Sequence, residues 1–599
     1  MPTPSPALND SANFSMAITV DGNAFDSDKI VSVELWNRIN RVPRARLVIN
    51  DGDPSDQTFP LSEALTFQPG HKVTIAAGYD QHNTVIFSGV IVKHGIEIEP
   101  DAPSRLVVEM TDHALKMTLQ RKSAVFKQKS DHDVVAQLIT QNGLTAGKNE
   151  APAAQQDAIV QFHASDWDML LTRAEANGLL VIVTGGSVDV VALDTSSTPV
   201  LEVEYGDSML AFEAEVDAAS QLTSGAAVSR SWSYTTQEVL EGAAADETVN
   251  APGNFEANTL ADVFGLKAAP RLTAAMLSKD SLDSWASDAL LRARLGRVSG
   301  QVQFQGSSLA KVGKMIALAG IGPRLSGNAY ITGTHHAITD NRWRTVVDFG
   351  LAADRFAAGA PNIADPPAGG LLPPVQGLQT GLVKQVAEDP DGNHRVLVTL
   401  PLLGGETAGV WARLGGLYAS NAFGAVFYPE IGDEVMLGFM SEDPRSPVII
   451  GSVYSKGRAP AYPPNKENDK KAIVTRSKLE VTFDDKDKII EIKTPGGHSI
   501  QLNDKTGEIA IKDSNKNSIV LGKSGIAIDS ASDITMTAKA NITVKAGANL
   551  AMQATADSTL KAINITEQAS AKHAVSANAM AELKASGILT INGALVKIN

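Results

Sequence analysis

The sequence contains no cysteine, which excludes disulfide cross-links and thiol catalysis. It contains no run of about 20 apolar residues, so we expect no transmembrane helix. The first residues, Met1 to Asn13, are polar and rich in proline, without the basic start and apolar stretch of a signal peptide. We therefore expect the protein to be made and assembled in the cytoplasm, and to depend on another machine if it leaves the cell.

Basic and aromatic residues are both scarce. The chain has 52 Lys and Arg against 67 Asp and Glu, a net charge of -15, which argues against binding nucleic acid over a broad surface. Aromatic residues make up 5% of the sequence, and none follows Phe483. A region of this length without aromatic side chains does not readily form an ordinary globular core. The whole chain is 43% hydrophobic, and the part before this region is long enough to form several globular domains with buried cores.

The C-terminal region has an eight-residue repeat in place of aromatic side chains. Apolar residues occupy two columns that lie two positions apart, as in a short strand with one buried face. Small residues and Asp or Asn fill the other columns, and the pattern slips near Ile563 before it resumes. The predicted interior positions are Ile526, Ile528, Ile534, Met536, Ile542, Val544, Leu550, Met552, Leu560, Ile588, Ile591 and Val596.

One chain with two apolar residues in eight cannot bury a core alone, whereas several identical chains wound about one axis can. We therefore predict that residues 479–599 form an intertwined β-helix, a stiff needle. Its first part has alternating apolar pairs, from Val481 and Phe483 to Ile519 and Leu521. A flexible tail or an alanine-rich helix is the alternative. The regular recurrence of β-branched residues and the lack of a 3.6-residue period favour the β-helix.

Two proline-rich segments, predicted as linkers at 359–376 and 456–478, enclose a run of short strands at 377–455. This spacing suits a small closed barrel such as an OB-fold. Four sequence blocks follow one another there: RVLVTLP from Arg395, VWAR from Val410, PEIGDEV from Pro429 and DPRSPVIIG from Asp443. We predict turn-forming and strand-forming roles for their main residues, which are Arg395, Trp411, Pro429, Gly432, Asp433, Glu434, Asp443, Pro444 and Pro447.

These blocks, in this order, resemble the VgrG family of contractile injection systems, which fuses a phage-tail hub to its needle. The resemblance implies a homotrimer whose hub joins an inner tube and baseplate proteins, and whose needle meets the target membrane mechanically. It also implies a PAAR-type tip protein, and it leaves room for an effector cargo. The predicted tip contacts are Val596, Lys597, Ile598 and Asn599. A phage tail hub or spike protein, or a delivered effector with hydrolase activity, are the alternatives.

In this interpretation the N-terminal half is the hub. After a flexible start at 1–14, two β-rich segments at 15–112 and 225–358 are predicted to form two barrels around an α/β segment at 113–224. Helices are predicted after Ser130 and Ser165, each with an acidic residue three positions on and glycine past the end, and at Ser281 to Leu295. The fold class is therefore mainly β and multidomain: two hub barrels, an inserted α/β segment, an OB-fold and a trimeric β-helix.

Three common catalytic motifs are missing from the sequence. Neither Gly-x-Ser-x-Gly nor His-Glu-x-x-His occurs, and the segment at Gly522-Lys523-Ser524 lacks the first glycine of a phosphate loop, because Asn517 stands there. His335 and His336 are adjacent in a predicted strand and would point to opposite faces. A metal on a threefold axis at His498 or His573 is a minor alternative. We predict a structural protein without enzymatic activity, cofactor or metal.

Overall fold

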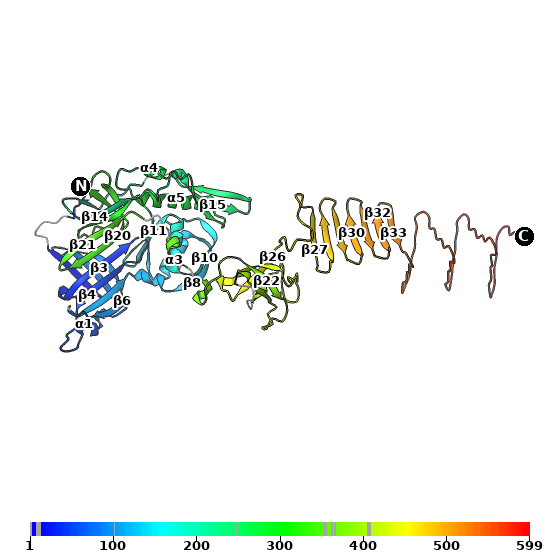
Figure 1. Cartoon of the computed structure of the whole chain (residues 1–599), viewed down its shortest axis with the longest axis horizontal. Coiled ribbons are helices and arrows are strands. Elements are labelled where there is room, and N and C mark those ends of the chain that lie inside the picture. Colours follow the sequence, from blue (N-terminus) through cyan, green and yellow to red (C-terminus); the bar gives the residue numbers. More distant parts are fainter. Residues whose placement is uncertain are drawn as a thin grey trace. The chain divides into compact units, whose positions relative to one another are not determined.

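The computed structural model describes residues 3–6, 13–100, 102–245, 249–351, 356–360, 363, 367–403 and 409–598. The chain divides into two compact units, Met1–Val453 and Tyr454–Asn599. Most of its regular structure is β (Figure 1), which confirms the predicted fold class. Among the described residues, no helix is long and apolar enough to cross a membrane.

The hub is built on a 13-stranded sheet that joins the two predicted β-rich segments. The strands of the first segment are β1 (Phe14–Val20), β2 (Asn23–Phe25), β3 (Ile30–Arg38), β4 (Arg44–Asn50), β5 (Lys72–Tyr79), β6 (His82–Glu97) and β7 (Arg105–Thr111), with the short helix α1 (Pro60–Glu63) between β4 and β5. The strands of the second are β18 (Val298–Gln305), β19 (Met315–Ala319), β20 (Gly327–Thr339) and β21 (Arg342–Phe349). Antiparallel pairing of β3 with β20 connects the two halves.

Each half of the sheet has its own apolar core. The first core centres on buried side chains such as Leu47, Phe67 and Ile75. The second centres on Phe304 and the strands around it. Trp343 of β21 reaches into the first core, where its ring stacks on that of Tyr79 at 5.8 Å. The two cores correspond to the two halves that the sequence analysis treated as separate barrels.

The predicted boundary of the α/β segment at residue 224 is wrong. Strands β13 (Leu201–Glu204) and β14 (Met209–Val216) belong to the second half of the sheet, where β13 pairs with β19 and β14 with β18. Leu201 and Val203 are buried in its core, whereas Glu202 and Glu204, which alternate with them along β13, are exposed. That alternation suits a sheet with one buried face, so these strands join the barrel that follows them.

The α/β segment consists of two similar strand–helix–strand units. The first comprises β8 (Arg121–Ser130), α2 (Asp131–Thr140) and β9 (Thr145–Asn149), and the second β10 (Gln155–Ser165), α3 (Asp166–Ala176) and β11 (Leu179–Thr184), followed by β12 (Ser187–Ala192). The hydroxyl groups of Ser130 and Ser165 accept the N–H of the third helical residue, which confirms the two predicted helix starts. Ser-Asp-x-Asp at each start and Asn-Gly-Leu after each helix recur 35 residues apart, which indicates an internal repeat.

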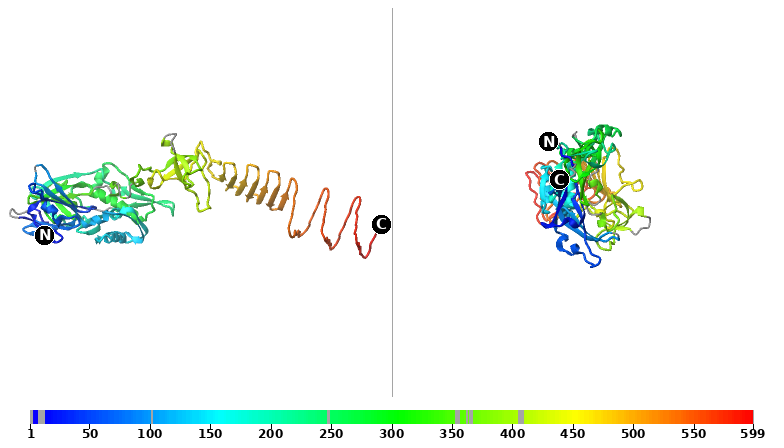
Figure 2. Two further views of the ribbon diagram at one scale, coloured as in Figure 1. Left: turned by 90° about the horizontal axis from the view of Figure 1, so that it is seen from below. Right: turned by 90° about the vertical axis from the view of Figure 1, so that its left-hand side faces the viewer.

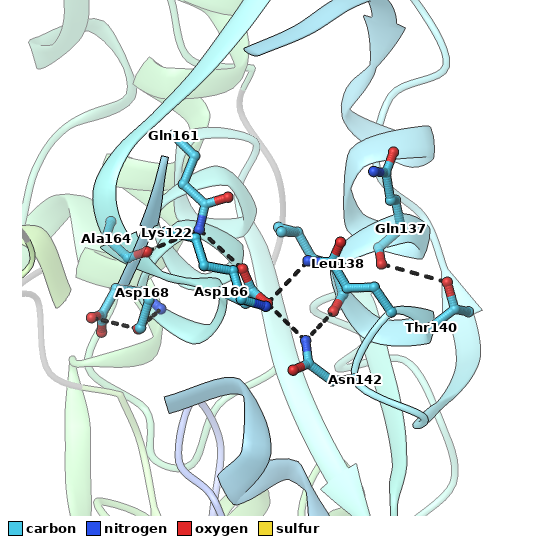
Figure 3. Close-up of polar contacts among 11 residues, drawn as sticks. Lys122, Gln137, Leu138, Thr140, Asn142, Gln161, Ala164, Asp166 and Asp168 are labelled. Atoms are coloured by element: carbon cyan, nitrogen blue, oxygen red, sulfur yellow. Dashed lines mark hydrogen bonds and ion pairs between the residues drawn. The ribbon is translucent and has the colours of Figure 1, made fainter. Parts of the chain in front are cut away.

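Buried hydrogen bonds and an ion pair join the two strand–helix–strand units of the α/β segment to each other. Asp131 at the start of α2 accepts hydrogen bonds from Asn177, at the end of α3, and from Nε and Nη2 of Arg173 at 2.6 and 2.7 Å. Asp166 at the start of α3 accepts a hydrogen bond of 2.8 Å from Asn142, which follows α2 (Figure 3). The start of each helix is therefore hydrogen-bonded to the end of the other helix.

Asp166 is almost fully buried, and its carboxylate collects four polar partners. Lys122 lies 2.5 Å from it, and Gln161, Gln141 and Asn142 donate hydrogen bonds to it (Figure 3). Burial raises the pKa of this carboxyl, but the hydrogen bonds outweigh it and hold the pKa below the ordinary value. The four donors keep a buried charge satisfied between β8, β10 and the two helices.

Besides the 13-stranded sheet and the α/β segment, the hub contains a small three-stranded sheet that packs on a long helix. Its strands are β15 (Ala227–Ser233), β16 (Glu238–Ala243) and β17 (Ala269–Thr273), and the helices of this region are α4 (Ala257–Asp262) and α5 (Lys279–Leu295). The predicted helix at Ser281 starts two residues earlier, because Ser278 and not Ser281 is its N-cap. A short helix, α6 (Phe356–Gly359), follows the second half of the sheet.

The middle region is a closed five-stranded barrel, as predicted. Its strands are β22 (Gln379–Gln385), β23 (Val396–Thr399), β24 (Val410–Leu414), β25 (Glu434–Phe439) and β26 (Pro447–Ser452). Its core is small and aliphatic, with Val396, Val435 and Leu437 fully buried. Closure leaves none of its five strands with an open edge.

The second unit begins as a seven-stranded antiparallel meander. Its strands are β27 (Lys470–Val474), β28 (Glu480–Asp484), β29 (Ile489–Lys493), β30 (Ser499–Asn503), β31 (Glu508–Lys512), β32 (Ser518–Gly522) and β33 (Gly525–Asp529), each paired with the next. After β33 the backbone continues in wide, extended turns (Figure 2). The bends recur every eight residues, at 531–532, 539–540, 547–548 and 555–556, so the sequence repeat is also a repeat of the backbone.

Candidate functional site

The meander carries two continuous rows of apolar side chains on one face. Cross-strand register aligns the first row, Phe483, Ile490, Leu502, Ile509, Leu521 and Ile526, and the second, Val481, Ile492, Ile500, Ile511, Ile519 and Ile528. The predicted apolar pairs thus share one face, and Ile526 and Ile528 extend the rows into the eight-residue repeat. From Ile490 on, the row residues are 37% to 71% exposed in the single chain.

A groove of about 590 Å³ runs along the second row. Its apolar lining includes Ile492, Ile500, Ile511, Ile519, Ile528 and Ile534. Ile534 lies beyond the last strand, so the repeat continues the apolar face of the meander. Thr494, Asp513 and Asn517 form part of a polar rim on the same groove.

The remaining predicted interior residues are also exposed in the single chain. Met536, Ile542, Val544, Leu550, Met552, Leu560, Ile588, Ile591 and Val596 are 48% to 90% exposed. Among the described residues from 454 to 598, only Ala510 is a buried apolar residue. A unit of this size with one buried apolar side chain lacks the core that it would need to be stable alone. Its apolar face is therefore a site for other chains.

At the predicted tip contact, Val596 is 48% exposed and Ile598 is 86% exposed. Lys597 is exposed beside them, and Asn599 lies outside the described residues. Nothing in the chain itself covers these three residues in the part that the structure describes, and their role as a tip contact stays a prediction.

The barrel motif residues form turns, strand ends and ion pairs. Gly432 has a φ of 83°, in the turn where the Asp433 carboxylate accepts the Glu430 N–H, and Glu434 begins β25. Pro429 and Pro447 are buried, Pro444 is partly buried, and Trp411 lies opposite Leu397 in the barrel wall. These positions suit the predicted fold-keeping roles.

Two arginines of the motif pair with carboxylates in their own turns. Arg395 lies 2.6 Å from Asp389 and 2.5 Å from Asp391, and its hydrogen bonds hold the pKa of Asp389 well below the ordinary value. Hydrogen bonds from Arg445 lower the pKa of Asp443 to about 2. Both carboxyl groups are therefore charged at neutral pH and are used within their turns.

A long loop between β24 and β25 exposes several large apolar side chains, which the sequence analysis missed. They are Leu417, Tyr418, Phe423, Val426, Phe427 and Ile431, each at least 58% exposed. Of these, Tyr418 and Phe423 are in contact, with ring centroids 6.0 Å apart, and large exposed apolar side chains that lie together are typical of a protein–protein contact. The run from Leu417 to Ile431 is visible in the sequence, but most of it lies between two of the four motif blocks, so the motifs did not point to it.

The adjacent histidines of β20 do point to opposite faces. His335 stacks on Trp36 at 5.0 Å, whereas His336 is buried, and its Nδ1 accepts a hydrogen bond from the Trp343 indole and lies 2.9 Å from the Thr345 hydroxyl. Among the described residues, no three His, Asp or Glu side chains are placed to hold a metal ion. His498 is exposed, and His573 lies 3.5 Å from Glu567.

Burial lowers the pKa of His336 from its ordinary value of 6.5 to about 4. Between these values the unfolded chain binds a proton that the folded chain does not, so the free energy of unfolding falls as pH drops through this window. The expected loss is about 3 kcal/mol. Urea unfolding at several pH values should show this slope in the wild type, and a smaller one in His336→Asn, which keeps an acceptor near Trp343. Equal slopes in the two proteins would contradict the expected effect.

Family models match the barrel and the apolar face. The type VI secretion system/phage-baseplate injector OB domain matches residues 379–454, and the phage baseplate V C-terminal trimerisation domain matches residues 489–553. Barrel and trimerisation region together define the class: a spike protein of the VgrG type, trimeric, with a structural role in a baseplate or spike. The Alg8 N-terminal domain model matches residues 10–340, more than half of the chain. The chain therefore belongs to the family of the Alg8 N-terminal domain.

Solved structures similar to the chain include tail proteins and a component of the type VI secretion system. A tail protein from Neisseria meningitidis MC58 is 13% identical over 57% of this chain and 96% of that chain, with a TM-score of 0.42. The 43 kDa tail protein of prophage MuSo2 from Shewanella oneidensis is 10% identical over 57% and 99%, with a TM-score of 0.41. An E. coli component of the type VI secretion system is 14% identical over 73% and 99%, with a TM-score of 0.33. Because these likenesses are distant, the class assigned above depends on the family models.

Proposed function

We propose that three copies of this chain form the puncturing spike of a contractile injection machine. The hub joins an inner tube and baseplate proteins, and the needle transmits the force of contraction to a target membrane. The spike is assembled in the cytoplasm and leaves the cell when the machine fires. The observation that carries this proposal is the apolar face of the second unit, which has almost no core of its own and matches a trimerisation domain.

The function proposed is mechanical and not enzymatic. The ionisable groups of the barrel motif are engaged in ion pairs and turns, such as Arg395 with Asp389 and Asp433 with the Glu430 N–H. The buried carboxylates of the hub have structural partners, as Asp131 and Asp166 do. A PAAR-type tip protein is proposed to bind at Val596, Lys597, Ile598 and Asn599, because the exposed apolar residues there would otherwise meet water. An effector cargo is compatible with this arrangement.

Light scattering of the purified chain tests the proposal. The expected mass is three times the 63.0 kDa of one chain, and it should fall to that of a monomer when residues 479–599 are deleted. The trimer should also resist heat until the needle opens, because its strands are held by other copies. A monomer before and after the deletion would contradict the proposal.

A further inference from the structure

The sheet of β15, β16 and β17, here called the arm, has one covered face and one open face. Ser229 and Ser231 are buried toward α5, and the Ser229 hydroxyl donates a hydrogen bond to the Leu282 carbonyl at 2.6 Å. Gly242 allows this close packing, since a Cβ there would lie 2.4 Å from the Leu282 backbone. The alternating residues of the same strands must therefore point away from the hub.

The open face of the arm is apolar with one ion pair. Trp232 lies opposite Val239, and Arg230 lies between Glu241 and Leu272 in the register. Trp232 is 46% exposed, Val239 60% and Leu272 70%. Arg230 is paired with Glu241 at 2.7 Å, so this face carries large apolar side chains and no unbalanced charge.

A second apolar face lies on the pair β8 and β10, here called the ribbon. Val125 and Val160 are directly opposite each other in the register, and each is 57% exposed. Phe162, two residues further on β10, is 76% exposed. The exposed lysines Lys127 and Lys129 lie on the same strand as Val125. The ribbon face is therefore apolar with a basic border.

Buried ion pairs hold the arm and the ribbon in a fixed relation. Arg271 of β17 lies 2.9 Å from Asp288 of α5, and Arg292 of α5 lies 2.8 Å from Asp288 and 3.0 Å from Glu175 of α3. Helix α3 continues directly from β10 of the ribbon. In Figure 1 the arm (β15) lies above α3 and the ribbon strand β8 below it. Each hub therefore presents two different apolar faces on one rigid support.

We propose that, in the trimer, the arm face of one copy packs against the ribbon face of the next copy. A closed ring of three identical chains needs an interface between two different surfaces of the subunit, which the arm and the ribbon provide. The one acid of the open arm face, Glu241, is already paired with Arg230, so the proposed contact is apolar: Trp232, Val239 and Leu272 of one copy against Val125, Val160 and Phe162 of the next. The needle also keeps the three hubs at high local concentration. This proposal rests on the trimeric spike described above.

Single cysteine variants test whether the two faces are covered. Because the chain has no cysteine, each variant carries one reactive thiol. Val239→Cys and Val160→Cys are compared with Val85→Cys, a valine of β6 that is 54% exposed. In trimers confirmed by light scattering, a maleimide reagent should react with the first two at least about tenfold more slowly than with the control. In the same variants made monomeric by Val544→Asp, the three rates should be similar.

A cross-linking experiment tests which surfaces meet. The double variant Val160→Cys/Val239→Cys, treated with a short flexible bismaleimide, should give covalent trimers on a denaturing gel, whereas Val85→Cys/Val239→Cys should not. Equal labelling of all three single variants in confirmed trimers would overturn the proposal. Protection of both faces without cross-linking would also overturn it, since other surfaces would then cover them. A monomeric wild-type chain would contradict the proposed spike itself, and light scattering detects this before any labelling.

Discussion

Replacement of Val544 by aspartate is expected to convert the trimer to monomers. Val544 belongs to the apolar face, and in a threefold assembly the new carboxylate would occur three times in one layer of a water-poor interior. Leaving an unpaired charge in such a place costs on the order of 3–5 kcal/mol, and here the three charges also repel one another. Light scattering should give the 63.0 kDa mass of a single chain in place of the trimer. Ile534→Asp should act in the same way.

The matched control is Thr543→Asp, which introduces the same charge one residue away. Successive residues of an extended segment point to opposite sides, so this carboxylate should remain in water and the trimer should persist. Trimers of Val544→Asp with unchanged heat resistance would contradict the shared-interior interpretation. Loss of trimers in both variants would show that charge anywhere on the repeat is harmful, and that the apolar face is not the reason.

Replacement of Arg292 by methionine is expected to cause the largest loss of stability in the hub. Its guanidinium is 3% exposed and bridges Glu175 and Asp288, which are 4% and 2% exposed. Methionine has a similar length but no charge, so the buried carboxylate of Glu175 would lose its counterion and that of Asp288 would keep only Arg271. Removal of one partner from a buried ion pair typically costs about 3–5 kcal/mol. Urea unfolding, monitored by the fluorescence of Trp285 and the other tryptophans, measures this loss.

Lys279→Met serves as the control, because Lys279 lies on the same helix and pairs with Asp283 across 2.5 Å at the surface. Such exposed pairs contribute about 0.5 kcal/mol or less. Both variants are best compared in the Val544→Asp background, so that trimer dissociation does not mask the unfolding of the hub. Similar losses for the two variants would mean that the buried network contributes no more than a surface pair.

The features predicted from the sequence are those encoded by neighbouring residues. The helix starts at Ser130 and Ser165 were found because the capping serine and its acidic partner lie three positions apart. The start of α5 was predicted two residues late, because its cap Ser278 is followed three positions on by Ser281 and not by the acidic residue that marks the other two helix starts. The apolar rows were found because an i, i+2 pattern fixes which side chains share a face.

Features that depend on distant residues were missed. The pairing of β3 with β20 joins residues about 300 positions apart, and nothing in either strand announces the other. Arg292 contacts Glu175, which lies 117 positions earlier (292 − 175), so the buried network was invisible before the fold was known. The open face of the arm was missed because Trp232 alternates with serines, which give a weak strand signal. In the proposed spike, the partners of the repeat beyond β33 belong to other copies of the chain, so one sequence could not reveal them.

Ala510, the one buried side chain among the described residues of the second unit, also bears on how the protein is made. The hub and the barrel have their own cores and can fold on a single nascent chain, since domains generally fold as units. The needle cannot, because its interior exists only after three chains have met. At equilibrium, the amount of formed needle therefore rises with the third power of the concentration of free chain. At low concentration, the chain would therefore have a folded hub and barrel and an unfolded needle region.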